Sequence, residues 1–133
     1  MILLDTSGLL CYVHENEPQH REAVQILDNT GRSLTRSYVL SEFVALAQAR
    51  HYPRFHSLNF IIALLENPDI DTVWVDESLH REAMDLLLAR PDKTYSLCDA
   101  VSFVLMRQRG LDEALTTDRH FEREGFRRLL FPV

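Results

Sequence analysis

The residues Ile2-Leu3-Leu4-Asp5-Thr6-Ser7 place a carboxylate directly after a short apolar run, and a helical pattern follows from Gly8 to Tyr12. This order predicts a buried strand that leads into a helix. Four further segments have the composition of strands, at 33–36, 72–75, 114–117 and 129–131. Because helical patterns separate these segments, they predict βαβ units and a parallel sheet. We therefore expect an α/β fold, a three-layer α/β/α sandwich around a central, mainly parallel sheet.

Capping and breaking residues bound the predicted helices. Ser37 and Asp76 are each placed to cap a helix, because their side-chain oxygens can accept the free N–H groups of a first turn. Asn67-Pro68 is expected to end an apolar helical segment that pairs with the helix beginning at Ser37. The nearly all-apolar segment 96–109 predicts a further helix that ends at Gly110.

The composition is that of an ordinary soluble domain. The chain has 133 residues, of which 46% are hydrophobic and 26% are charged, and this length suits a single domain spanning residues 1–133. No stretch approaches the roughly 18 apolar residues of a membrane span, and the first acid comes too early for a signal peptide. We therefore expect no membrane association and a cytoplasmic location. Cys11 and Cys98 lie in apolar stretches and are expected to be buried.

Four carboxylates stand inside segments that otherwise resemble protein core: Asp5, Glu42, Asp99 and Asp118. Asp5 and Asp118 follow predicted strands, whereas Glu42 and Asp99 lie in predicted helices on faces that are otherwise apolar. Burying a lone carboxylate costs several kcal/mol, and no Lys accompanies these acids to compensate them. Since the carboxyl ends of parallel strands meet in one crevice, we expect the four side chains to converge there. Clustered oxygen ligands predict a Mg²⁺ or Mn²⁺ site and a phosphoester substrate.

Each acid also has a structural alternative. Ser96 and Asp99 have the spacing of a helix capping box. Asp5 could turn the chain after its strand, and Asp118 could cap the short helix predicted from residue 119. Glu42 could pair with a basic group of a neighbouring element. The coincidence of all four acids at such positions favours the metal site.

The formal net charge of −6 argues against a protein that binds nucleic acid by charge alone. Bound divalent cations would cancel much of that charge and reverse the local field. All but one of the fourteen basic residues are Arg, whose planar guanidinium suits phosphate. Candidates for phosphate contacts flank the acids: Arg36, Arg50, Arg54 and Arg119.

Four segments of the chain resemble, in order and spacing, the acidic motifs of PIN domains: Leu3-Leu4-Asp5-Thr6-Ser7, Ser41-Glu42-Phe43, Leu97-Cys98-Asp99-Ala100-Val101-Ser102 and Leu115-Thr116-Thr117-Asp118-Arg119-His120-Phe121. The resemblance covers essentially the whole chain and implies that the four matching acids are catalytic and coordinate the metal. It also implies that Thr116 helps to orient the site and that Ser7 supports the first acid. Some members carry a further acid where this chain has His120, which leaves a second metal open. By itself, His120 is interpreted as a surface or structural residue.

The resemblance further implies metal-dependent RNA hydrolysis by a toxin of the VapC type, leaving a 5′-phosphate and a 3′-hydroxyl. A small antitoxin that inserts a segment across the acidic crevice, and a homodimer, are implied in the same way. The class of RNA stays open. Two alternatives also stay open. One is a PIN-fold RNA-processing nuclease without an antitoxin. The other is a PIN fold that binds without cleaving, which the presence of all four acids disfavours.

Two other enzyme or binding classes fit less well. A phosphatase with a nucleophilic Asp usually has a second acid two residues after the first, where this chain has Ser7. A receiver domain has paired acids at the first strand end and a Lys late in the chain. Lys93 precedes Asp99, so the order of residues disfavours the receiver.

Overall fold

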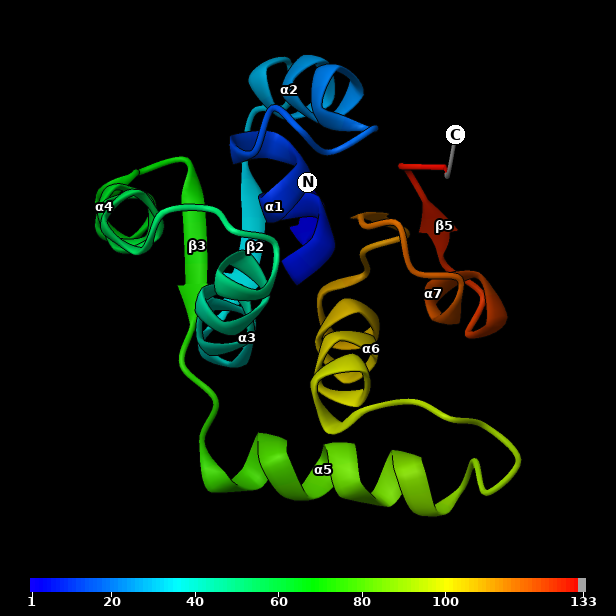
Figure 1. Cartoon of the computed structure of the whole chain (residues 1–133). Coiled ribbons are helices and arrows are strands. Elements are labelled where there is room, and N and C mark those ends of the chain that lie inside the picture. The colour runs from blue at the N-terminus through cyan, green and yellow to red at the C-terminus, as the bar shows by residue number, and fades with distance from the viewer. Residues whose placement is uncertain (132–133) are drawn as a thin grey trace.

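The computed structural model describes residues 1–131. Within these residues, one or two helices separate each strand from the next along the chain (Figure 1). Their bounds are β1 Ile2–Leu4, α1 Thr6–Val13, α2 His20–Asp28, β2 Ser33–Arg36, α3 Ser37–Ala49, α4 Arg54–Glu66, β3 Ile70–Val73, α5 Glu77–Leu88, α6 Leu97–Arg109, β4 Glu113–Leu115, α7 His120–Arg123 and β5 Arg127–Arg128.

The sheet has the strand order β3-β2-β1-β4-β5, and every neighbouring pair is parallel. Strand β1 lies at its centre, where Leu3 pairs with Leu34 of β2 and with Ala114 of β4. Successive side chains of a strand point to opposite faces. Accordingly, Ile2 and Leu4 pack with the core residues of α1 to α4, while Leu3 packs with those of α6. The predicted three-layer α/β/α fold is confirmed.

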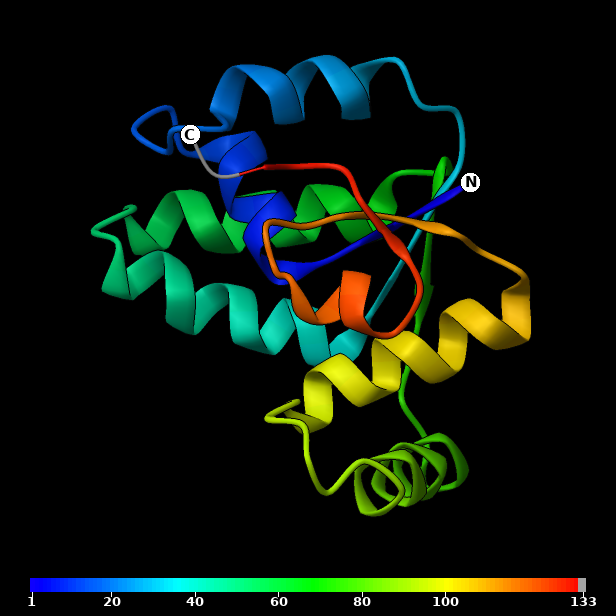
Figure 2. The same cartoon turned by 90° about the vertical axis from the view of Figure 1, so that its right-hand side faces the viewer.

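The helices form two layers, one on each face of the sheet. Helices α3 and α4 run side by side and are joined by a short turn, as predicted for this pair (Figure 2). On the other side, α5 lies outermost and packs across α6 (Figure 1). None of the helices in the described part of the chain is long and apolar enough to cross a membrane.

Some predicted boundaries are wrong. Helix α3 begins at Ser37 itself, with Arg36 in the capping position, and the Ser37 hydroxyl accepts a hydrogen bond from the Val75 backbone N–H at 2.9 Å instead. The last strand is β5, at 127–128 rather than 129–131. Leu130 lies after it and is fully buried in the core. The caps predicted at Asp76 and Ser96 are confirmed, as is the left-handed Gly110 after α6.

Gly8 allows the first helix to lie directly against the end of β4. A Cβ atom at this position would lie 1.9 Å from the Leu115 carbonyl oxygen, so any other residue would force the two elements apart. The Asp5 backbone N–H also donates to that carbonyl at 3.2 Å. This close approach brings the start of α1 and the residues after β4 into one place.

Candidate active site

Asp5 and Thr116 immediately follow the two adjacent central strands β1 and β4. Asp5 is only 6% exposed, and the Thr116 hydroxyl donates to its Oδ2 atom at 2.8 Å. The Asp118 backbone N–H donates in turn to the Thr116 hydroxyl at 3.0 Å. Thr116 therefore links the segments that carry the first and last acids, which is the orienting position expected from the sequence.

Ser7 supports Thr116 from the first turn of α1. Its hydroxyl lies 3.2 Å from the Thr116 hydroxyl and accepts a hydrogen bond from the Thr117 backbone N–H at 3.0 Å. The support that Ser7 gives to Asp5 is thus transmitted through Thr116. Because hydroxyl groups both donate and accept, Asp5, Thr116 and Ser7 form one connected chain of hydrogen bonds.

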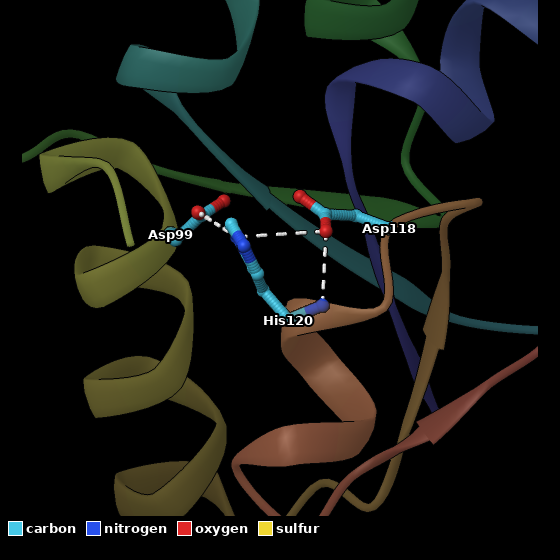
Figure 3. Close-up of side chains that lie close together, drawn as sticks. All are labelled: Asp99, Asp118 and His120. Carbon is cyan, nitrogen blue, oxygen red and sulfur yellow. Dashed lines mark hydrogen bonds and ion pairs between the residues drawn. The ribbon is translucent and has the colours of Figure 1, made fainter. Parts of the chain in front are cut away.

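Asp99, Asp118 and His120 form a cluster of possible metal-ligand atoms, with one atom from each lying within 4.8 Å of the others (Figure 3). The His120 Nδ1 atom is 3.0 Å from Asp99 Oδ2 and 3.5 Å from Asp118 Oδ1. The His120 backbone N–H also donates to Asp118 Oδ1 at 2.9 Å. His120 is therefore inside the acidic cluster rather than a residue outside the site. The sequence feature that could have placed His120 in the site is its position two residues after Asp118, where some PIN domains carry a further acid.

Asp99 has two roles in the structure. It completes a capping box in which its backbone N–H donates to the Ser96 hydroxyl, and its Oδ2 accepts from the Ser96 backbone N–H, both at 3.0 Å. The same carboxylate faces His120. The structural alternative for Asp99 is thus present together with the cluster, and the two are compatible because a carboxylate has several acceptor sites.

Glu42 does not have the apolar surroundings expected from the sequence. It is exposed, because α3 buries the face that carries Val39, Phe43 and Ala47 and turns Glu42 to solvent. The Thr6 hydroxyl donates to Glu42 Oε1 at 2.8 Å, which holds Glu42 against the start of α1, next to Asp5. Neither Glu42 nor Asp5 belongs to the cluster of Asp99, Asp118 and His120.

Arg36 cannot make the phosphate contact suggested by the sequence. It is 0% exposed, and its Nη2 atom donates to the carbonyl oxygen of Cys98 and, at 3.1 Å, to the Cys98 sulfur. The two cysteines are buried and free, as expected. Burial raises the pKa of the Cys98 thiol to about 12, so Cys98 stays protonated.

The remaining Arg candidates stay predictions. Arg50 pairs with Glu17 at 2.8 Å through Nη1, and its side chain remains about half exposed. Arg54 and Arg119 are exposed.

The electrostatics of Asp5 are those of a carboxylate that a neighbouring cation would stabilise. Burial raises the pKa of Asp5 to about 6, although the Arg36 charge and the hydrogen bond from Thr116 act to lower it. The neighbouring charge of Asp99 raises it further. Carboxylates that crowd one another are stabilised by a divalent cation, and carboxylate oxygens are the ligands that hard ions such as Mg²⁺ and Mn²⁺ prefer. The residues present therefore fit a divalent metal ion.

The raised pKa of Asp5 predicts how the stability of the metal-free protein depends on pH. The unfolded carboxyl titrates near 3.8 and the folded one near 6. Between these values the folded state holds a proton that the unfolded state has lost, so stability falls as the pH rises. The loss should amount to about 3 kcal/mol, since one pKa unit corresponds to about 1.4 kcal/mol.

Urea unfolding in EDTA, with wild type and Asp5→Asn compared at several pH values, measures how much Asp5 contributes to the pH dependence of stability. The stability of wild type relative to the variant should fall between about pH 4 and pH 6. A difference that stays constant over this range would show that Asp5 titrates normally.

Acids gathered at the carboxyl edge of a parallel sheet, as ligands suited to a divalent metal, are typical of metal-dependent phosphodiester hydrolases. The chain belongs to the PIN domain family, whose model matches residues 2–126. This confirms the family that the four acidic motifs indicated. PIN domains are metal-dependent nucleases.

The curated relatives include the 23S rRNA-specific endonuclease VapC20 of Mycobacterium tuberculosis, in strains CDC 1551 and H37Rv. Each is 28% identical over 127 residues, which is 95% of this chain and 95% of the relative. Among solved structures, M. tuberculosis VapC20, described as a Sarcin-Ricin loop cleaving toxin, superposes with a TM-score of 0.88 at 25% identity, over 99% of this chain and 100% of that one. A toxin–antitoxin complex from Klebsiella pneumoniae shares the fold, with a TM-score of 0.69 at 17% identity and the same coverage.

Proposed function

We propose that this protein is a metal-dependent ribonuclease of the VapC type, the toxin of a toxin–antitoxin pair, and that residues 1–133 act as one PIN domain. The observation that carries the proposal is the cluster of Asp99 and Asp118, to which Asp5 is linked through Thr116, in a chain of the PIN family. Each of these acids also accepts a hydrogen bond within the fold, but such bonds alone do not require three carboxylates to lie so close together.

Asp5, Asp99 and Asp118 are the proposed ligands of Mg²⁺ or Mn²⁺, with Glu42 at the exposed margin of the site and His120 as a neighbour. The bound ion supplies charge neutralisation at the scissile phosphate and acidifies the attacking water. Thr116 holds Asp5 in one orientation, and such outer hydrogen bonds tune metal ligands. Glu42 is exposed and fixed by Thr6, so it can accept the proton that the attacking water loses.

RNA is the proposed substrate, and ribosomal RNA is the class favoured by likeness to the relatives from M. tuberculosis. With a net charge of −6, the protein cannot rely on general attraction to phosphate. Arg50, Arg54 and Arg119 are exposed or partly exposed at positions that flank the acids, and they are the proposed phosphate contacts.

A small antitoxin and a second copy of the chain are the proposed protein partners. The fold shared with a toxin–antitoxin complex supports the antitoxin, which would cross the acidic crevice. Exposed apolar side chains follow α4 at helical spacing, and they support a homodimer: Phe55, Leu58, Ile62 and Leu65. Such contiguous apolar surface usually marks an interface.

The test is to map RNA ends after incubating purified protein with total RNA, in Mg²⁺ or Mn²⁺ and in excess EDTA. We expect a small set of cuts with 5′-phosphate and 3′-hydroxyl ends, all absent in EDTA because the reaction requires the metal. Cleavage that continues undiminished in EDTA, from a preparation free of contaminating nuclease, would rule out the proposed chemistry.

A further inference from the structure

Arg36 is a charged side chain in an unusual environment. It ends strand β2, and it is one of the largest fully buried side chains among the described residues. Its Nη2 atom donates to Cys98, whereas Nε and Nη1 are buried without a hydrogen-bond partner among residues 1–131. Arginine stays charged in proteins, and an uncompensated buried charge is strongly destabilising. Some nearby negative charge must therefore stabilise it.

The guanidinium lies beside the segments that carry the acids of the active site. Strand β2 pairs in parallel with β1, with Leu34 opposite Leu3, so the residues that end the two strands lie close together. Among these acids, Asp5 has a charge that interacts with that of Arg36. Cys98, which Arg36 contacts, directly precedes Asp99, and Glu42 lies in the helix that begins after Arg36.

Arg36 also differs from the other buried arginine in the described part of the chain. Arg128 is 6% exposed and forms an ion pair with Glu122 at 2.9 Å. Arg36 has no carboxylate within ion-pair distance in residues 1–131. Its charge therefore acts on the cluster at longer range. Such interactions are weakly screened when the groups are buried.

We propose that Arg36 is a positioning residue of the active site, an internal counter-charge that holds the carboxylates together while no metal is bound. Through its bonds to Cys98 it also fixes the first turn of α6, which carries Asp99. This inference rests on the proposed function of the acidic cluster as a metal site. Arg36 and the metal then share one task, because each compensates the same negative charge.

A double-mutant cycle of Arg36→Met and Asp5→Asn, followed by thermal unfolding in EDTA, tests the counter-charge. Arg36→Met should lower the Tm by about 10 °C or more, because it leaves the acids uncompensated. Adding Asp5→Asn to Arg36→Met should raise the Tm again by several degrees, and by more than Asp5→Asn raises that of wild type. If Arg36→Met alone is insoluble, recovery of a folded double mutant is the same result.

Arg36→Lys and Arg128→Met are the matched controls. Arg36→Lys keeps the cation and should keep most of the Tm, although it loses the geometry of the Cys98 contact. Arg128→Met removes a buried arginine with its own partner and should gain nothing extra from Asp5→Asn. Equal effects of Asp5→Asn in all backgrounds, or an Arg36→Lys protein as unstable as Arg36→Met, would overturn the proposal.

Mn²⁺ supplies an independent readout. Because the metal is the remaining compensation in Arg36→Met, saturating Mn²⁺ should raise the Tm of this variant by more degrees than it raises that of wild type. An equal or smaller increase in Tm would contradict the inference that Arg36 and the metal compensate the same negative charge. If Mn²⁺ stabilises none of the proteins, the metal site fails, while the cycle in EDTA still decides the role of Arg36.

Discussion

The Asp5→Asn protein is expected to cleave RNA at least about a thousandfold more slowly than wild type, a loss of about 4 kcal/mol of transition-state stabilisation. Its metal-free form should unfold at the same temperature or slightly higher. Asp5 is buried and has a raised pKa, so the neutral amide is better tolerated there than the carboxylate. The amide oxygen can still accept the hydrogen bond from Thr116.

Single-turnover cleavage of the mapped RNA, with unfolding curves for the same preparations, measures both effects. Asp112→Asn is the matched control, because Asp112 is an exposed acid at the opposite end of the β4 strand. It should cleave RNA as fast as wild type. A folded Asp5→Asn protein with wild-type cleavage would remove Asp5 from the catalytic site.

Asp99→Asn is expected to lose most of the stabilisation that Mn²⁺ gives to wild type, together with most of the activity. At a metal concentration of about 100 Kd, that stabilisation is about 2.7 kcal/mol. The variant should keep nearly the same metal-free stability, because its amide oxygen can still accept from the Ser96 backbone N–H. A carboxylate that repels its neighbours would also be removed.

Ser96→Ala separates the cap from the cluster. It removes the hydroxyl that accepts from the Asp99 backbone N–H and leaves the carboxylate in place. It should cost about 0.5–2 kcal/mol in EDTA and in Mn²⁺ alike, and the Mn²⁺ stabilisation should persist. Melting curves of both variants, with EDTA and with Mn²⁺, decide the matter. If Mn²⁺ stabilises Asp99→Asn as much as wild type, Asp99 is a structural cap alone.

The fold class and three of the four acid positions could be predicted from local patterns. Asp5 and Asp118 follow short apolar runs, and Asp99 lies among apolar residues of a helix, so the order of elements was enough to place them at one edge of the sheet. The last strand could not be placed, because its residues Arg127 and Arg128 are charged while the apolar residues after them fill the core.

Two expectations about site residues are wrong, an apolar face around Glu42 and a phosphate contact by Arg36, and both depend on packing between distant segments. The helix around Glu42 has apolar residues on more than one face, so the sequence does not decide which face is buried. The packing of α3 leaves Glu42 exposed. Arg36 is an ordinary polar strand end in the sequence, and the Cys98 segment, 62 residues later, is what contacts it. His120 joins the cluster because the short helix α7 directs its ring toward Asp99 of α6 (Figure 3).

Anomalous diffraction from crystals soaked in Mn²⁺ tests the central claim most directly, because it locates the ion independently of activity. We expect a strong anomalous peak with carboxylate oxygens of Asp5, Asp99 and Asp118 in its coordination sphere, directly or through water, at the distances typical of a small divalent ion, about 2.1 Å for direct contacts. The same peak should be absent from Asp5→Asn crystals. A wild-type protein that cleaves RNA in Mn²⁺ but whose bound ion lies away from these three residues would contradict the account.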